Sequence, residues 1–417
     1  MSHCRAVAAE APVSWPGDER SNAALVLEAV RSRPRIARVE VSRRTGLSPP
    51  TVTSVTADLI AAGLLAEMPL AEPEAGRRGR PRVGLRVRGE AHCVVGGKLA
   101  DRALTLALLD FSGVTLAEQE MPMAPGPAPP ERVADAIAAG VARIAAEGGL
   151  ATDDISAIGI GVPGFVDGER GRVHWSRSFD RRDVDLAGLL EGRFACPVFT
   201  DNDANLVAMA ELRFGLGRDV KNFVAVTLES GLGMGIVIDG RVYRGARHKA
   251  AELGHTKVAL DGALCTCGQR GCLEAYVAEY ALLREADVIV GPARGGDAEA
   301  GMTALYAAAE AGHPRAVEIF RRAGRMFGLG LANVVNIFDP SLIVLSGGSM
   351  RYRYLHDETV LAEMRANIIM AGDPPPRVEV HEWGDLLWAK GAAALALDGI
   401  TELALARLSR SQRSSAS

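Results

Sequence analysis

The chain has 417 residues, 48% hydrophobic and 24% charged, with a formal net charge of −4. This length suits two or three domains, and the composition is typical of a soluble globular protein. There is no apolar run of 18 or more residues, and residues 1–20 lack the apolar segment of a signal peptide, so we expect no membrane span and a cytoplasmic location. We expect disordered tails at residues 1–20 and 406–417.

Three helices are predicted near the start of the chain. Apolar residues at helical spacing place them over residues 23–32, 38–44 and 49–62. Gly46 marks a tight turn between the last two helices, and Ser48 has the side chain of an N-cap. Pro49 and Pro50 fit the first helical turn, where a missing N–H costs nothing.

Two short strands follow, residues 64–70 and 82–89, on either side of a Gly-, Pro- and Arg-rich loop. Helix, turn, helix and then a strand pair is the order of a winged helix-turn-helix, which we predict over residues 21–88. Residues 1–90 hold fourteen Arg against ten Asp or Glu, so the rest of the chain carries −8. A basic first segment on an acidic body favours nucleic-acid binding, although so modest an asymmetry also fits chance.

The third helix is the candidate recognition helix. Its apolar residues predict a buried face made of Val52, Val55, Leu59 and Ile60, and its hydroxyl residues predict an exposed face made of Thr51, Thr53, Ser54 and Thr56. The loop carries Arg77, Arg78, Arg80 and Arg82, which could enter a narrow minor groove. We predict DNA contacts from Pro50, Thr51, Thr53, Ser54, Arg77, Arg78 and Arg80. The alternatives are a solvated helix face and a flexible basic linker.

From His92 onward, short buried strands alternate with helices, which predicts an α/β domain. The expected strands lie at 93–98, 103–113, 157–166, 197–203 and 341–348. An amphipathic helix is expected over 131–147 and another over 386–400. The segment 223–245 predicts a hairpin that turns at Asp239-Gly240.

A cluster of metal-binding residue types lies near the middle of the chain. Three cysteines, Cys265, Cys267 and Cys272, follow His255 and are spaced by a Gly-containing turn. One His and three Cys supply a closed tetrahedral set, which predicts structural Zn²⁺ without an open position for activated water. The alternative is three free thiols beside an unrelated His, which the cytosolic context makes the weaker interpretation.

Polar side chains gather at two further places. Asn202 and Asp203 follow an apolar strand, and Glu252 and Glu274 bracket the cysteine cluster. Carboxylates and amides of this kind can bind the hydroxyl groups of a polyol. Taken alone, Glu252 and Glu274 could each be a surface charge, and Asn202 and Asp203 could be a helix cap.

Five stretches of the chain together resemble the ROK family of repressors, uncharacterised frames and sugar kinases. They are residues 158–173, 197–211, 222–258, 265–276 and 336–348. The resemblance implies a two-lobed, actin-like ATPase fold (α/β), with one lobe over 89–200 plus 380–405 and the other, with the zinc loop, over 201–379. The winged helix ahead of it resembles the repressor branch of the family.

The resemblance also assigns the sites. It implies sugar contacts from Gly164, Asn202, Asp203, Glu252, His255 and Glu274. It implies zinc ligation by His255, Cys265, Cys267 and Cys272, and it places the catalytic base of a kinase on Asp203. Homodimers or homotetramers are the implied assembly.

The two turns that hold nucleotide phosphates in kinases of the family are altered here. The first falls on residues 98–102, where Lys98, Ala100 and Asp101 replace an Asp and two glycines. The second holds Glu229 and Met234 where small residues are expected. Side chains and a carboxylate oppose close approach of phosphate, so we expect loss of ATP binding, unless Gly96-Gly97 shifts the alignment.

Two functions from different classes follow. The first is a sugar-responsive, DNA-binding regulator, acting as a repressor, whose partners are operator DNA and a sugar or sugar phosphate. The second is an active ATP-dependent sugar kinase with a DNA-binding arm that uses Asp203 as base. A constitutive DNA-binding protein with an inactive sensor is a third interpretation, and the altered phosphate turns favour the first. The sequence identifies neither the sugar nor the operator.

Overall fold

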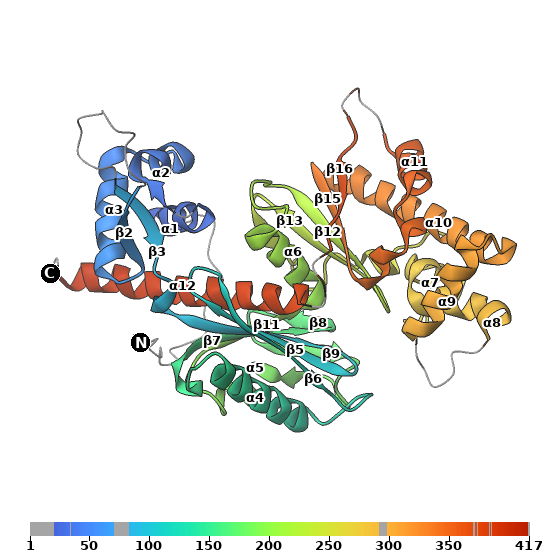
Figure 1. Ribbon diagram of the computed structural model, residues 1–417, viewed down its shortest axis with the longest axis horizontal. Coiled ribbons are helices and arrows are strands. Elements are labelled where there is room, and N and C mark those ends of the chain that lie inside the picture. Colours follow the sequence, from blue (N-terminus) through green and yellow to red (C-terminus); the bar gives the residue numbers. More distant parts are fainter. Residues whose placement is uncertain are drawn as a thin grey trace. The chain divides into compact units, whose positions relative to one another are not determined.

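The chain divides into two units, shown in Figure 1. The computed structural model describes residues 21–33, 35–70, 83–291, 298–369, 372, 374–382, 384 and 386–415, without the side chains of 411–415. The first unit comprises Met1–Leu206 and Trp388–Ser417, and the second comprises Val207–Leu387. The sequence predicts that the two lobes meet after residues 200 and 379, and the observed boundaries lie six to eight residues later. They lie there because helix α6 (Asp203–Phe214) and helix α12 (Leu387–Ser415) cross them.

The N-terminal part of the first unit is a small winged-helix region, residues 22–87. Three helices pack beside a three-stranded antiparallel sheet of order β1-β3-β2. The helices are α1 (Asn22–Ser32), α2 (Arg38–Thr45) and α3 (Pro49–Ala61), and the strands are β1 (Ile36–Ala37), β2 (Leu65–Pro69) and β3 (Val83–Val87). Gly46 ends α2 with a φ of 72°, a conformation that favours glycine, and Ser48 caps α3 by accepting from the Thr51 N–H at 3.3 Å. The predicted winged helix-turn-helix is confirmed.

A mixed five-stranded sheet forms the body of the first unit, in the order β11-β7-β4-β5-β6. Strands β4, β5 and β6 are an antiparallel meander, and β4, β7 and β11 pair in parallel. Their bounds are β4 (Cys93–Leu99), β5 (Ala103–Asp110), β6 (Thr115–Pro122), β7 (Ile155–Val162) and β11 (Val198–Asn202). Helix α4 (Pro130–Glu147) packs on one face of this sheet, with Val133, Ile137 and Ile144 buried.

Helix α12 packs against the other face of the same sheet at very short range. A Cβ atom on Gly96 of β4 would lie 2.1 Å from the Ala389 carbonyl oxygen, and one on Gly159 of β7 would lie 1.9 Å from that of Ala392. Glycine at these two strand positions is therefore what lets the helix backbone touch the sheet. The remaining elements of this unit are η1 (Gly89–Ala91), η2 (Thr152–Asp154), α5 (Leu186–Glu191) and the small sheet β8 (Gly164–Asp167), β9 (Arg172–Ser176) and β10 (Val184–Asp185).

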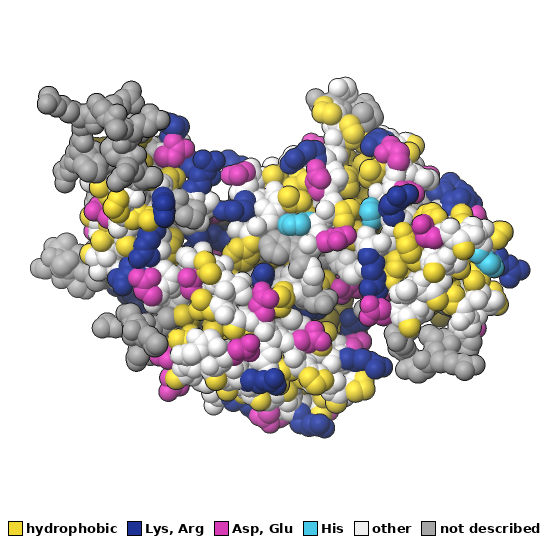
Figure 2. Space-filling view, in the orientation of Figure 1, with side chains coloured by type: hydrophobic (Ala, Val, Ile, Leu, Met, Phe, Trp, Pro, Cys, Tyr) yellow, Lys and Arg dark blue, Asp and Glu magenta, His cyan; other side chains and the backbone are white. Residues whose placement is uncertain are grey.

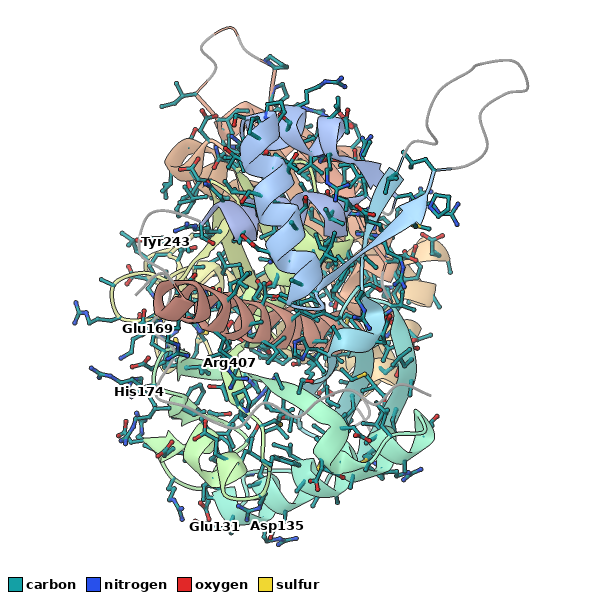
Figure 3. The ribbon with its side chains drawn as sticks, turned by 90° about the vertical axis from the view of Figure 1, so that its left-hand side faces the viewer. Glu131, Asp135, Glu169, His174, Tyr243 and Arg407 are labelled. Atoms are coloured by element: carbon teal, nitrogen blue, oxygen red, sulfur yellow. The ribbon has the colours of Figure 1, made fainter. Side chains whose placement is uncertain are left out.

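The winged-helix region contacts the body through α1, α12 and the end of β5. Arg31 of α1 donates to the Thr401 hydroxyl of α12 at 3.2 Å and lies 4.7 Å over the ring of Phe111. His92 meets the same ring edge-on and lies 3.2 Å from the Ser156 hydroxyl. Burial lowers the pKa of His92 to about 4, and the positive charges of Arg407 and Arg31 act in the same direction. Figure 3 shows α12, which carries Arg407, passing between the winged-helix region and the sheet.

A second five-stranded sheet forms the centre of the second unit, in the order β14-β13-β12-β15-β16. Its strands are β12 (Phe223–Leu228), β13 (Leu232–Ile238), β14 (Arg241–Tyr243), β15 (Leu342–Ser346) and β16 (Arg377–Val380). Strands β13 and β14 meet at a two-residue turn in which Asp239 and Gly240 have φ of 51° and 70°, as the sequence predicts for this hairpin. The helices are α7 (Glu274–Val277), α8 (Glu279–Val290), α9 (Ala298–Glu310), α10 (Pro314–Phe338) and α11 (Glu358–Asn367), with short turns η3 (Leu253–His255), η5 (Gly348–Arg351) and η6 (Arg353–Leu355).

Long α10 supplies much of the second unit's core. Its buried residues Phe320, Phe327 and Leu331 pack in one cluster with β12, β13 and β15 side chains. The described helices contain no segment long and apolar enough to cross a membrane.

One expectation about the chain's end is wrong. Residues 406–415 were expected to belong to a disordered tail, but they continue α12 without a break. The helix persists past the predicted end at residue 400 because its first turns are anchored on the sheet and Thr401 contacts Arg31. The expected N-terminal tail, residues 1–20, lies outside the described residues.

Candidate functional site

Helix α3 presents most of the predicted DNA-contact residues at its surface. Pro50, Thr53 and Ser54 are exposed, and Thr51 is partly exposed, on the side away from the fully buried Val52 and Leu59. Two of the hydroxyl groups already have local partners, because Thr53 donates to the Pro49 carbonyl at 2.9 Å and Thr51 lies 2.7 Å from the Ser48 hydroxyl. These bonds stay within one helical turn, so they leave the surface accessible.

Thr56 does not belong to this exposed face, contrary to the sequence expectation. It is 0% exposed, donates to the Thr53 carbonyl and accepts from the Arg38 guanidinium at 3.0 Å. Its position four residues after Val52 and three before Leu59 places it on the buried stripe. Val55 and Ile60, expected to be buried, are only partly so.

The predicted wing arginines, Arg77, Arg78, Arg80 and Arg82, lie outside the described residues. Strands β2 and β3, which flank them, pair from Leu65↔Val87 to Pro69↔Val83. Figure 2 shows basic side chains over the visible face of the winged-helix region.

A polar group in the first unit combines Gly164 with Asn202 and Asp203. The Asn202 amide donates to the Gly164 carbonyl at 2.8 Å, and its Oδ1 accepts from the Ala204 N–H at 2.9 Å. Asn202 ends β11, which pairs in parallel with β7, so the group lies at the carboxyl edge of parallel strands. Asn202 therefore caps α6, which is the alternative role that the sequence allows for it. Its amide also holds the loop that carries Gly164.

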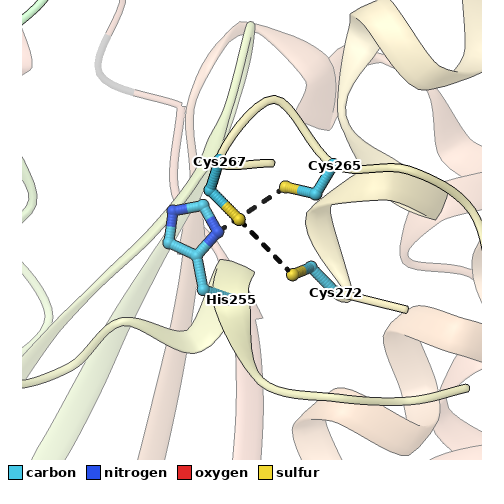
Figure 4. Close-up of side chains that lie close together, drawn as sticks. All are labelled: His255, Cys265, Cys267 and Cys272. Carbon is cyan, nitrogen blue, oxygen red and sulfur yellow. Dashed lines mark hydrogen bonds between the residues drawn. The ribbon is translucent and has the colours of Figure 1, made fainter. Parts of the chain in front are cut away.

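Four side chains of the second unit converge in a cluster that could hold a metal ion, shown in Figure 4. Ligand atoms of His255, Cys265, Cys267 and Cys272 all lie within 4.8 Å of one another. The His255 Nδ1 is 3.7 Å from the Cys265 Sγ, and the Cys267 and Cys272 Sγ atoms are also 3.7 Å apart. Ligands about 2.0–2.3 Å from a central ion stand about 3.3–3.8 Å apart in a tetrahedron, and these two separations of 3.7 Å lie in that range.

His255 uses its two ring nitrogens in different directions. Nδ1 faces Cys265, whereas Nε2 lies 3.9 Å from a carboxylate oxygen of Glu252. The two assignments made for this residue, metal ligand and sugar contact, are therefore compatible, because each needs a different nitrogen.

Glu274 lies beside the same cluster and is buried. Its Oε2 accepts from the Leu232 N–H at 3.2 Å, and its Oε1 accepts from the Thr266 and Tyr280 hydroxyls at 3.1 and 3.4 Å. Burial is the main cause that raises the pKa of Tyr280. Glu274 thus ties the cysteine loop to strand β13, and Glu252, His255 and Glu274 lie near one another.

The first altered phosphate turn, residues 98–102, is filled by side chains that have partners in the first unit. The Lys98 ammonium lies 3.4 Å from the centre of the Trp388 ring, and Asp101 pairs with Arg177 at 3.2 Å. No residue of this turn is a glycine.

The second altered turn carries a carboxylate that reaches a neighbouring glycine turn. A Glu229 oxygen accepts from the Gly348 N–H at 3.3 Å, where β15 ends in the Gly347-Gly348 turn. Burial raises the pKa of nearby Glu279, and the negative charge of Glu229 adds to this effect. An acidic environment of this kind repels phosphate.

Sequence reasoning missed three residues that surround the cysteine loop. Lys257 donates to the Cys272 Sγ at 2.8 Å and to Gln269 at 2.6 Å, and the Tyr280 hydroxyl lies 3.7 Å from the Cys265 Sγ. No motif identifies them, since their contacts depend on how the loop folds back on residue 257.

Comparison with known proteins places the chain in a family. Residues 96–399, most of the chain, match the ROK family. The chain belongs to the ROK family. Residues 25–66 match a winged helix-turn-helix DNA-binding family, in agreement with the fold of the winged-helix region.

Relatives within the ROK family include both kinases and repressors. The chain is 34% identical to a glucokinase from Streptomyces coelicolor over 265 residues, 61% of this chain and 81% of that protein. It is 28% identical to the xylose repressor of Caldicellulosiruptor bescii over 384 residues, 90% of this chain and 95% of the repressor. A solved ROK family transcriptional regulator, a homolog of the E. coli MLC protein, matches with a TM-score of 0.77 at 26% identity, covering 93% of this chain and 98% of its own. The regulators thus match the chain over a larger share than the glucokinase does.

Proposed function

We propose that this ROK protein is a sugar-responsive, DNA-binding repressor of carbohydrate metabolism genes that does not transfer phosphoryl groups. The observation that carries the proposal is one chain with both a winged-helix region and a ROK body in which the counterparts of the family's phosphate turns carry the acidic residues Asp101 and Glu229. A turn without glycine and a turn that carries a carboxylate both disfavour a triphosphate. The similarity to repressors over nine tenths of the chain supports the same conclusion.

The proposed effector is a sugar or sugar phosphate. We assign its contacts to Gly164, Asn202 and Asp203 of the first unit and to Glu252, His255 and Glu274 of the second. The amide and carboxylate oxygens suit sugar hydroxyls, which both donate and accept hydrogen bonds. Sugar binding would favour one conformation of the chain and thereby change its affinity for the operator.

The proposed metal is a structural Zn²⁺ held by His255 Nδ1 and the three cysteine sulfurs. Thiolate and imidazole ligands in a tetrahedral set favour zinc, and four protein ligands leave no open position for catalysis. The metal would fix the loop that carries Glu274.

The proposed operator contacts come from α3 and the wing. Pro50, Thr51, Thr53 and Ser54 are accessible on α3, and the wing arginines Arg77, Arg78 and Arg80 are assigned to phosphates or the minor groove. A homodimer or homotetramer would present two such helices to a palindromic operator.

An ATP-dependent sugar kinase is the second candidate. It is favoured by Asp203, which the family resemblance places as base, and by the similarity to a glucokinase. In that case Asp203 would accept a proton from a sugar hydroxyl.

One experiment separates the two candidates. Purified protein is titrated onto DNA from upstream of its own gene in a gel-shift assay, with and without a panel of pentoses and hexoses. The same panel is then assayed for sugar-dependent ATP hydrolysis. A repressor gives a shift that one sugar weakens and no sugar-dependent hydrolysis. Robust turnover with any sugar would establish the kinase, and a shift that no sugar alters would indicate an inactive sensor.

A further inference from the structure

The proposed zinc centre carries an excess of negative charge. Three thiolates and one neutral imidazole around Zn²⁺ leave a net charge of −1. Two carboxylates add to it, because a Glu274 oxygen lies 3.7 Å from the Cys265 Sγ and Glu252 lies 3.9 Å from His255. A centre of this charge is stabilised by a nearby cation.

Lys257 places a cation directly on the centre. Its ammonium donates to the Cys272 Sγ at 2.8 Å and to the Gln269 side-chain oxygen at 2.6 Å. Cys272 is fully buried, whereas the Lys257 residue as a whole is exposed, so the ammonium reaches a buried sulfur from the solvent side. Arg270 and Arg284, on or near the same loop, donate instead to backbone carbonyls of Gly262 and Leu264.

The backbone holds Lys257 in this position. Lys257 and Cys272 form an antiparallel bridge, so their side chains leave the backbone on the same side. The neighbouring hydrogen bonds, from the Val258 N–H to Gly271 and from the Leu273 N–H to Thr256, fix the register. The Lys257–Cys272 contact is therefore built into the loop, and it does not depend on a chance rotamer of a surface lysine.

We propose that Lys257 is a positioning residue of the zinc centre: it donates a charge-assisted hydrogen bond to the Cys272 thiolate, offsets the negative charge and slows loss of the metal. The inference rests on the proposed zinc site. Partners outside the ligand shell commonly change metal affinity by about 10- to 100-fold. Because Lys257 faces solvent, we expect the lower end of this range and a dependence on salt.

The test compares full-length wild type with Lys257→Met, Lys257→Gln and Lys257→Arg. Zinc affinity and the rate of zinc release are measured by competition with a chromophoric chelator. We expect about tenfold weaker zinc binding and faster release in Lys257→Met and Lys257→Gln at low salt, and a smaller difference at 1 M salt. Lys257→Arg, which keeps the charge and the donor, should stay within about threefold of wild type. Two neutral variants are used so that the result does not depend on the folding of one.

The absorption spectrum of bound Co²⁺ provides a readout that would not change if the substitutions only destabilised the loop. In the Co²⁺-loaded proteins, loss of the hydrogen bond to the Cys272 sulfur should shift the thiolate-to-metal charge-transfer band, and Lys257→Arg should restore it. Lys221→Met, which removes an exposed lysine elsewhere in the second unit, should leave affinity and spectrum unchanged.

The outcomes distinguish this inference from the zinc assignment. Neutral variants that hold zinc within twofold of wild type with an unchanged cobalt spectrum would overturn the role of Lys257 alone. A Lys221→Met variant as weak as Lys257→Met would reduce that role to bulk charge and overturn it too. A wild type that binds no zinc would remove the zinc assignment and this inference with it, while operator binding would still test the repressor.

Discussion

At the scale of single residues, local surroundings decide what a side chain does. His92 is an ordinary imidazole by sequence, but it is buried between the Phe111 ring and the Ser156 hydroxyl. Glu229 stands where the family resemblance predicts a small residue, and its carboxylate accepts a hydrogen bond from a backbone N–H of a glycine turn. Each of these two contacts leads to a measurable consequence.

His92 should make the first unit sensitive to acid. Its pKa of about 4 in the folded chain lies below the ordinary value of 6.5, so the unfolded chain binds the proton more readily. The stabilisation is complete above pH 6.5 and is lost as pH falls from there towards 4. We expect this group alone to remove about 2 kcal/mol of unfolding free energy between pH 7 and pH 5.

Urea unfolding of wild type and His92→Gln at both pH values measures this effect. Between pH 7 and pH 5, the unfolding free energy of His92→Gln should fall by about 2 kcal/mol less than that of wild type. His313→Gln, at an exposed histidine of the second unit, serves as control. Equal losses in wild type and His92→Gln would show that His92 is not the responsible group.

Glu229 should disfavour nucleotide at the second altered phosphate turn, to which it belongs. Replacing it with glycine removes a negative charge and uncovers the Gly348 N–H, so Glu229→Gly should bind Mg²⁺·ATP about tenfold more tightly than wild type. Glu229→Gln removes the charge but keeps an acceptor, and it should fall between the two. Isothermal titration of the three proteins with Mg²⁺·ATP is the measurement. Equal affinity in all three would contradict the role of Glu229 in opposing nucleotide binding.

At the scale of elements, hydrophobic period and turn chemistry predict most of the fold. The three N-terminal helices, the Ser48 cap and the Asp239-Gly240 hairpin are local features that neighbouring residues specify. What could not be predicted depends on contacts between distant segments. Thr56 accepts from Arg38 of another helix, and residues 406–415 continue a helix whose start lies on the sheet. A one-dimensional pattern contains neither contact.

For the candidate sites too, features within one segment could be predicted and contacts between separate segments could not. The cysteine spacing predicts the cluster that could hold a metal ion, because its members His255, Cys265, Cys267 and Cys272 lie close together in sequence. Lys257 could not be predicted, because its bond to Cys272 appears only once residues 257 and 272 are paired.

The contact between α12 and the sheet gives a prediction at this scale. Gly159→Ala would place a methyl group 1.9 Å from the Ala392 carbonyl oxygen. The clash involves the backbone of both the strand and the helix, so a change of side-chain rotamer cannot relieve it. We expect a loss of about 2–3 kcal/mol in the unfolding free energy of the first unit. Gly192→Ala, where the nearest atoms lie 3.7 Å away, should cost nothing. Urea unfolding of both variants measures the difference, and equal stability would contradict the close approach.

At the scale of the whole molecule, two units with separate cores should respond differently to metal removal. All four proposed ligands lie in the second unit, so a bound metal stabilises that unit and not the first. Calorimetry with and without a strong chelator should show the transition of the second unit moving to lower temperature, with the other unchanged.

Cys267→Ser without chelator should reproduce this selective shift, since Cys267 belongs to the proposed ligand set. A chelator that moves both transitions equally, or neither, would contradict a metal confined to the second unit.

The first unit is discontinuous, since α12 follows the second unit in the chain but belongs to the first. During translation the strands β4 and β7 therefore emerge long before the helix that covers them, and the second unit is complete first. Arg31 cannot reach Thr401 until the whole second unit and the first turns of α12 have been made. A nascent chain that has not yet reached Thr401 therefore carries α1 without this hydrogen bond, and only a chain that includes α12 can form it.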